Sequence, residues 1–146
     1  MDHTVVHFEI PADQPERAAK FYQELFGWDI NKYEGDVGME YWMVQTVPTG
    51  EDGRPTRPGV NGGLMRRMFP GQAPVNYIAV ESVDEFVRKA ERLGAKLLVG
   101  KQPVPSMGWF AQFTDPEGNV FAVWETDPNA GPAAVGAEEQ AGQRKR

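Results

Sequence analysis

Two side chains near the start of the chain, His7 and Glu9, are of types that carry acid–base or metal chemistry. The segment VVHFEI alternates as a half-buried strand does, which places positions two apart on one face. A neutral imidazole is a common ligand for zinc, nickel, manganese or iron and can also act as a general base. His7 and Glu9 are therefore the candidate catalytic pair. For a metal ion, His7 would be one ligand and Glu9 a possible second, which is only part of a complete site.

The composition narrows the classes of function. The 146 residues include no cysteine, so disulfides, zinc–thiolate sites and cysteine nucleophiles are excluded. The formal net charge of −6 argues against a nucleic-acid partner. No run of apolar residues is long enough to cross a membrane, and the first ten residues do not read as a secretion signal. We expect a cytoplasmic protein with no membrane partner.

The predicted strands and helices that position these residues occur in the same order in both halves of the sequence. The strand at 5–10 is followed by a helix in QPERAAKFYQELF that stops at Gly27, with Ala18, Phe21, Tyr22 and Leu25 on its predicted buried face. Strands are then expected at 28–33, 39–47 and 60–67. From residue 75 the order restarts, with Val83, Phe86, Val87, Ala90 and Leu93 on the buried face of a second helix and strands at 97–104, 108–114 and 119–125.

This repetition predicts an α+β domain over residues 1–126, built by internal duplication from two tandem βαβββ units at 4–67 and 75–126. Residues 127–146 are rich in Ala, Gly, Glu and Gln. Such a segment buries too little apolar surface to offset the entropy of ordering it, so we expect a disordered tail.

Three strings, VVHFEIPADQPERAAKFYQELFGW, GGLM at 62–65 and FTDPEGNVFAVWE, together resemble the superfamily of glyoxalases, bleomycin resistance proteins and extradiol dioxygenases, the vicinal oxygen chelate (VOC) proteins. The resemblance covers roughly residues 4–126. It implies that the sheets of the two units curl around a cleft, and that the protein forms a homodimer.

In metal-dependent members, the resemblance implies one ligand on the first strand and one on the last strand of each unit. His7 fills the first position, whereas Tyr77 stands where histidine is usual, and a neutral phenol is a poorer ligand. Ala122 and Gly63 occupy the two last-strand positions and offer no donor. Gln45 or Glu40 could supplement His7 and Glu9. We favour no cofactor, with a divalent Zn, Ni, Mn or Fe as the alternative.

Aromatic residues on several expected strands should line or underlie the implied cleft, as aromatic walls do in small-molecule pockets. Core packing would also explain most of them. Gly62 and Gly63 could permit close approach of a ligand, or mark a bulge or a bend in a curled sheet, and we favour the bend. The predicted ligand-binding residues are His7, Glu9, Tyr77, Trp124, Ala122, Trp42 and Trp109, with Tyr41 among the other strand aromatics.

Three functions remain open at this point. The favoured one is a metal-free protein that binds a small organic molecule in an aromatic-lined cleft, as drug-sequestering resistance proteins do. The second is a lyase, isomerase or dioxygenase that uses a metal or the acid–base pair His7 and Glu9. The third is a non-catalytic, dimerising interaction module. The sequence does not decide whether the chain is an enzyme.

Overall fold

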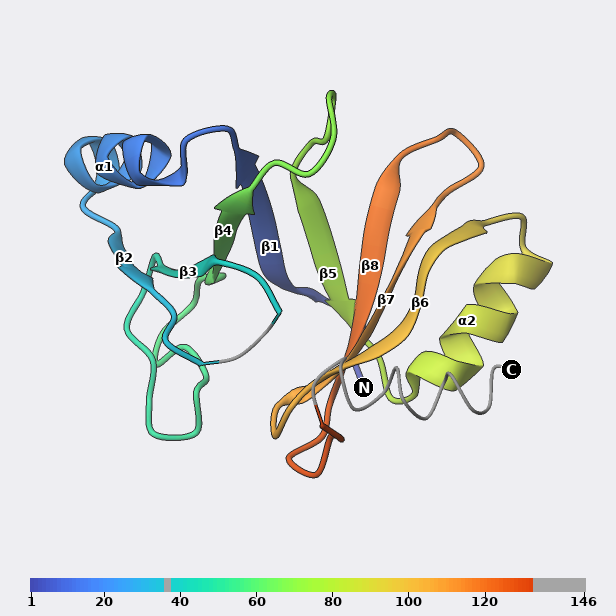
Figure 1. Ribbon diagram of the computed structural model, residues 1–146. Helices are drawn as coiled ribbons and strands as arrows, with labels where there is room; N and C mark the ends of the chain where they lie inside the picture. Colours follow the sequence, from blue (N-terminus) through green and yellow to red (C-terminus); the bar gives the residue numbers. More distant parts are fainter. Residues whose placement is uncertain (36–37, 133–146) are drawn as a thin grey trace. The chain divides into compact units, whose positions relative to one another are not determined.

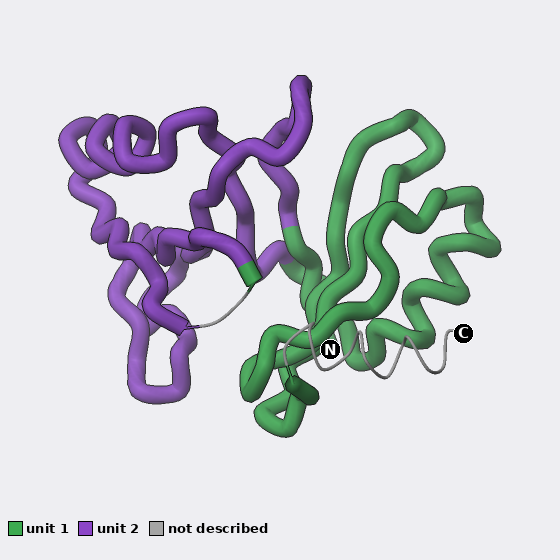
Figure 2. Tube along the Cα trace, viewed as in Figure 1, with its two compact units in different colours: residues 1–4, 36–38, 77–146 green, residues 5–35, 39–76 purple. Residues whose placement is uncertain are grey.

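The computed structural model describes residues 1–35 and 38–132 and divides the chain into two compact units (Figures 1 and 2). We call residues 5–35 and 39–76 the N-terminal unit, drawn in purple in Figure 2. Residues 1–4, 38 and 77–132 form the C-terminal unit, drawn in green. The boundary between the units falls inside one strand, β5.

The N-terminal unit has the predicted βαβββ order. Its elements are β1 (Val5–Ala12), α1 (Pro15–Phe26), β2 (Asp29–Lys32), β3 (Tyr41–Gln45) and β4 (Gly62–Arg66). The four strands form a sheet in the order β2-β3-β4-β1, in which β1 runs parallel to β4 and the other neighbours are antiparallel. The last strand of the unit therefore lies between β3 and β1.

The C-terminal unit repeats this topology. It consists of β5 (Val75–Ala79), α2 (Val83–Arg92), β6 (Lys96–Val104), β7 (Gly108–Thr114) and β8 (Val120–Thr126). Its sheet order is β5-β8-β7-β6, with β5 parallel to β8 and antiparallel pairs elsewhere. The α+β fold of two βαβββ units is thus confirmed, and most predicted strand bounds lie within two residues of those observed.

Each sheet carries its helix on one face, and the core lies between them. In the N-terminal unit this core comprises Ala12, Ala19, Ile30, Trp42, Val44 and Leu64, with Phe8 and Ile10 packed against it. In the C-terminal unit it comprises Val80, Val83, Ala111, Phe113 and Val123. Because side chains alternate along a strand, the intervening residues face away from the helix.

The helix ends follow the sequence, but parts of the predicted buried faces were wrong. Gly27 ends α1 in the left-handed conformation that glycine favours, with φ 74°, and its N–H bonds the Gln23 carbonyl. Phe21 and Leu25 are 57% and 56% exposed, because α1 meets the sheet through the neighbouring row of Pro15, Ala19 and Tyr22. Leu93 is also exposed, since it lies just beyond the last turn of α2.

Part of the expected tail can be placed. The Asp127 N–H donates to the Met107 carbonyl at 2.9 Å, and Ala130 is only 9% exposed. Residues 133–146 lie outside the described residues. Within the part that is described, no helix is long and apolar enough to span a membrane.

The N-terminal core offers a matched pair of leucines. Leu64 is fully buried and Leu25 is 56% exposed. We expect Leu64→Ala to lower the free energy of unfolding by about 2–5 kcal/mol through lost burial and the cavity left behind. Leu25→Ala should change it by less than about 0.5 kcal/mol. Urea unfolding followed by circular dichroism measures both, and equal losses would contradict the assigned core.

Candidate functional site

Three polar side chains meet on the face of the N-terminal sheet that points away from α1. His7 and Glu9 lie on β1, as the alternation predicted, and Tyr41 lies on β3. The Tyr41 hydroxyl is 2.8 Å from His7 Nε2 and donates a hydrogen bond of 2.9 Å to Glu9 Oε2. We call these residues the His7–Tyr41–Glu9 cluster. Tyr41 was noted in the sequence as a strand aromatic but was not among the predicted binding residues.

The pattern of hydrogen bonds indicates where the protons of this cluster lie. A carboxylate can only accept, so the Tyr41 proton points to Glu9. The phenol oxygen then accepts from His7, which requires the proton of the neutral imidazole to sit on Nε2. Burial lowers the pKa of His7 from 6.5 to about 4, because the charged imidazolium loses its hydration. His7 is therefore neutral at pH 7.

Gly63 makes this arrangement possible. It pairs with Glu9 on β1 and with Met43 on β3. A Cβ atom added at Gly63 would overlap the Tyr41 hydroxyl and ring, and one at Gly62 would overlap the Phe8 carbonyl and ring. Both glycines lie in a ladder of continuous register, so no bulge lies at these positions, and neighbouring groups approach both closely. The bend favoured from the sequence stays a prediction.

The corresponding face of the C-terminal sheet has a similar arrangement. Tyr77 on β5, Ala122 on β8 and Gln112 on β7 lie side by side in register. The Gln112 side chain reaches across Ala122 and donates a hydrogen bond of 2.8 Å to the Tyr77 hydroxyl. In both units, a long polar side chain of the third strand crosses a small residue of the last strand to reach the first strand.

Aromatic rings adjoin Tyr77 on this face. The Phe110 ring stands edge-on at 6.1 Å from the Tyr77 ring, and Trp124 pairs with Ala79 and with Phe110 along the sheet. Trp124 Nε1 donates to the Thr126 hydroxyl at 3.1 Å. Tyr77, Ala122 and Trp124 therefore share one face, as the sequence suggested. Gln112 was missed, although it follows Phe110 at the spacing of one strand face.

Two predicted binding residues lie on the opposite, helix-covered faces. Trp42 is 5% exposed within the core beneath α1. Trp109 packs against the core beneath α2, with its Nε1 donating to Asp127 Oδ2 at 2.9 Å and Lys101 Nζ above its ring. We therefore exclude both from the candidate site. Glu125 is on the same helix-covered face and accepts a hydrogen bond from the Val83 N–H at the start of α2.

The residues at the implied ligand positions do not fit a metal. His7 Nε2 already bonds Tyr41, and the space in front of Gly63 holds the phenol. Tyr77 accepts from Gln112, and Ala122 has no donor atom. Glu40 pairs with Lys32 and Arg66, and Gln45 donates to Thr49, so neither completes a site. Across residues 1–35 and 38–132 there is no group of three His, Cys, Asp or Glu side chains that could hold a metal.

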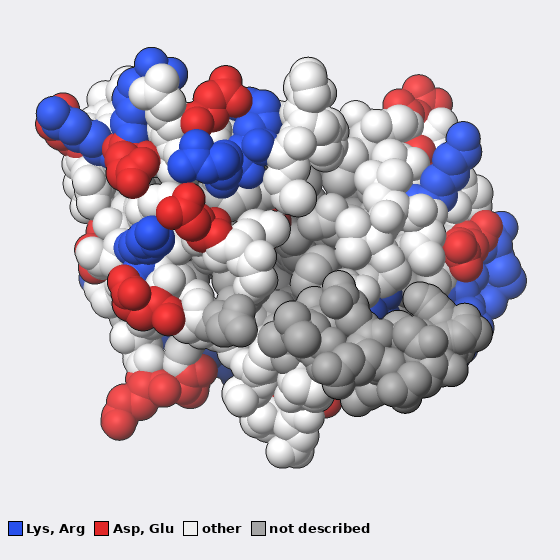
Figure 3. All heavy atoms as spheres, viewed as in Figure 1, with Lys and Arg blue, Asp and Glu red and all other residues white. Residues whose placement is uncertain are grey.

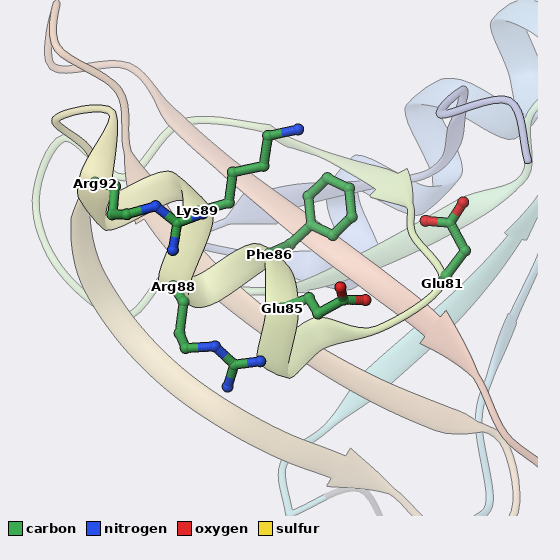
Figure 4. A pocket seen from close by; sticks show the side chains of 6 residues that line it. All are labelled: Glu81, Glu85, Phe86, Arg88, Lys89 and Arg92. Atoms are coloured by element: carbon green, nitrogen blue, oxygen red, sulfur yellow. The ribbon is translucent and has the colours of Figure 1, made fainter.

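Surface features elsewhere offer less chemistry. A depression of about 410 Å³ runs along α2, lined by Glu81, Glu85, Phe86, Arg88, Lys89 and Arg92 (Figure 4). The Arg88 and Lys89 side chains extend in opposite directions from the helix, so the cations do not converge on one point. On the face drawn in Figure 3, basic and acidic side chains are interspersed.

Residues 4–123 match the family model of the Glyoxalase/Bleomycin resistance protein/Dioxygenase superfamily. The chain belongs to this superfamily. The resemblance proposed from the three sequence strings is thereby confirmed at the level of family and fold.

Individual relatives are distant. "Putative glyoxylase CFP32" of Mycobacterium tuberculosis is 28% identical over 127 residues, which cover 86% of this chain and 45% of that protein. "Anthracycline biosynthesis protein DnrV" of Streptomyces peucetius is 24% identical, covering 92% of this chain and 51% of that protein. The chain thus spans about half the length of these curated relatives.

Among solved structures, the fold is similar to a Streptomyces coelicolor methylmalonyl-CoA epimerase variant in complex with 2-nitronate-propionyl-CoA. The TM-score is 0.63 at 13% identity, with 89% of this chain and 99% of that chain covered. At this identity the likeness supports the VOC fold alone.

The lowered His7 pKa predicts how stability depends on pH. An unfolded imidazole binds a proton near pH 6.5, whereas the folded one does so only near pH 4. The stability that neutral, partly buried His7 confers is therefore complete above pH 6.5 and is lost as the pH falls toward 4. At about 1.4 kcal/mol per pKa unit, the loss approaches about 3 kcal/mol.

Urea unfolding of the wild type and of His7→Gln between pH 7 and pH 4 measures this loss. Gln cannot titrate but can still donate to the Tyr41 hydroxyl. We expect the wild-type free energy of unfolding to fall more steeply than that of the variant. Parallel pH profiles would contradict the assignment of His7 as a partly buried imidazole with a lowered pKa.

Proposed function

We propose that this VOC protein binds a small organic molecule through its His7–Tyr41–Glu9 cluster without a metal ion. The observation that carries the proposal is the Tyr41 hydroxyl, which fills the space over Gly63 and engages both His7 and Glu9. This arrangement presents an imidazole, a phenol and a carboxylate together on one face of the N-terminal sheet. Such groups orient an organic ligand by hydrogen bonds.

The chemistry of these groups favours an organic ligand over a metal. A metal site needs several deprotonated ligands converging on one point, whereas here the imidazole Nε2 carries a proton directed at a phenol. A ligand with hydroxyl or carbonyl groups can exchange hydrogen bonds with these side chains. DnrV is named for anthracycline biosynthesis, and the epimerase structure contains 2-nitronate-propionyl-CoA. Both compounds are organic molecules, which is compatible with this proposal.

A second candidate function is metal-free acid–base catalysis, as in a lyase or isomerase. It is favoured by one observation: the Tyr41 hydroxyl lies within hydrogen-bond distance of both an imidazole nitrogen and a carboxylate oxygen. A proton can move between such groups when a substrate binds. In this version Glu9 acts as the base, since the low pKa of His7 makes its imidazole a weak one.

Metal analysis tests the metal-free part of the proposal. Tag-free protein is loaded separately with zinc, nickel, manganese and ferrous iron, freed of excess ion, and submitted to elemental analysis beside His7→Ala. We expect far less than one metal per chain, with no difference between the two proteins. Near-stoichiometric metal that disappears in His7→Ala would overturn the proposal and make a metal-dependent enzyme the working hypothesis.

Ligand screening tests the binding part. Backbone amide NMR spectra are recorded against a library of small hydroxylated and carbonyl-bearing aromatic compounds. We expect hits to shift the amides of β1, β3 and β4. Tyr41→Phe should weaken their binding about tenfold, because one hydrogen bond in a partly buried site is worth about 1 kcal/mol or somewhat more. Tyr33→Phe, on a residue outside the cluster, is the control. Hits that shift other amides, or that bind Tyr41→Phe as well as wild type, would contradict the assigned site.

A further inference from the structure

We propose that Gly63 is a positioning residue, whose missing side chain allows Tyr41 to reach the binding cluster. This inference rests on the proposed function, since it concerns the placement of one group of that same site. The size of residue 63 determines which group lies in front of His7 and Glu9. Gly63 has no side chain that could bind a ligand, so its role is to position Tyr41.

The sheet order creates the need for such a residue. Tyr41 is on β3 and its partners are on β1, with β4 between them. Neighbouring strands lie about 4.8 Å apart, so the two ends of this contact are separated by about 10 Å of sheet. The tyrosine ring must therefore pass over β4. It passes at Gly63, the residue that pairs with Glu9.

The backbone does not itself demand glycine here. Gly63 is not among the glycines with a left-handed, positive φ, and its strand is in regular register with both neighbours. The three atoms nearest to a Cβ at position 63 are the hydroxyl oxygen and two outer ring carbons of Tyr41. An added methyl group would therefore displace the end of a rotatable side chain rather than the main chain.

Gly62 provides a matched control in the same strand. A Cβ at Gly62 would meet the Phe8 carbonyl oxygen, which belongs to the paired strand and cannot rotate away. Both glycines are buried in β4 and neither has a positive φ. They differ in what the new methyl group would contact. At Gly63 it would meet the rotatable Tyr41 side chain, and at Gly62 it would meet the backbone of the paired strand.

The test is a double-mutant cycle measured as shifts of the thermal midpoint Tm. The variants are Gly63→Ala, Tyr41→Ala and the pair, beside Gly62→Ala with and without Tyr41→Ala. We expect Gly63→Ala to lower Tm when residue 41 is Tyr and to lower it much less when residue 41 is Ala, because the collision is then gone. The cost of Gly62→Ala should not depend on residue 41.

The second readout is the His7 side chain. The chain has only two histidines, so the His3→Gln background leaves one set of imidazole nitrogen signals. We expect Gly63→Ala to shift the Nε2 signal of His7 in the same direction as Tyr41→Phe does, because both changes remove the phenol from that nitrogen. A glycine with a merely structural role would lower Tm and leave this signal in place.

The inference is overturned if the cost of Gly63→Ala is independent of residue 41, or if the His7 signal does not move. The proposed function is still supported in either case, provided that the wild type binds a ligand from the screen and Tyr41→Phe weakens that binding. In the opposite case, the wild type binds no compound of the library but the double-mutant cycle gives the expected result. That outcome would refute the proposed function and support the role of Gly63.

Discussion

The passage of the Tyr41 ring over Gly63 is the constraint on which the rest of the candidate site depends. It requires the strand order β3-β4-β1, a residue without a side chain at the crossing, and polar partners on the far strand. Each hydrogen bond contributes only about 1 kcal/mol on balance, but leaving buried partners unsatisfied costs more. The three side chains therefore form one hydrogen-bonded group, and moving the phenol changes the surroundings of both His7 and Glu9.

In both units a side chain of the third strand crosses the last strand to reach the first strand, but the residues involved differ. In the C-terminal unit, Gln112 crosses Ala122 to reach Tyr77, as Tyr41 crosses Gly63 to reach Glu9. The family resemblance implies metal ligands at the last-strand positions, which here hold the small residues Gly63 and Ala122. Their small size leaves room for side-chain hydrogen bonds between strands. The membership in the superfamily and the absence of donors at these positions are compatible, because one fold supports several kinds of site.

Local patterns were enough to predict the fold and part of the site. Strand alternation placed His7 and Glu9 on one face, and the packing of Phe8 and Ile10 against the core on the other face confirms it. Trp42 and Trp109 were predicted to line the cleft because they are aromatic residues on strands. Their strands carry apolar residues on both faces, so the sequence does not show which face meets the helix. The Tyr41 contact depends on strand order and on an empty position in another strand, and neither is a local property. The homodimer and the cytoplasmic location stay predictions.

The most direct test of this account is a crystal structure of the protein determined after soaking with zinc or nickel. We expect the Tyr41 phenol to lie over Gly63, within hydrogen-bond distance of His7 Nε2 and a Glu9 carboxylate oxygen, and we expect no metal bound to His7. A metal ion coordinated by His7 Nε2, with the Tyr41 ring turned away from Gly63, would contradict it.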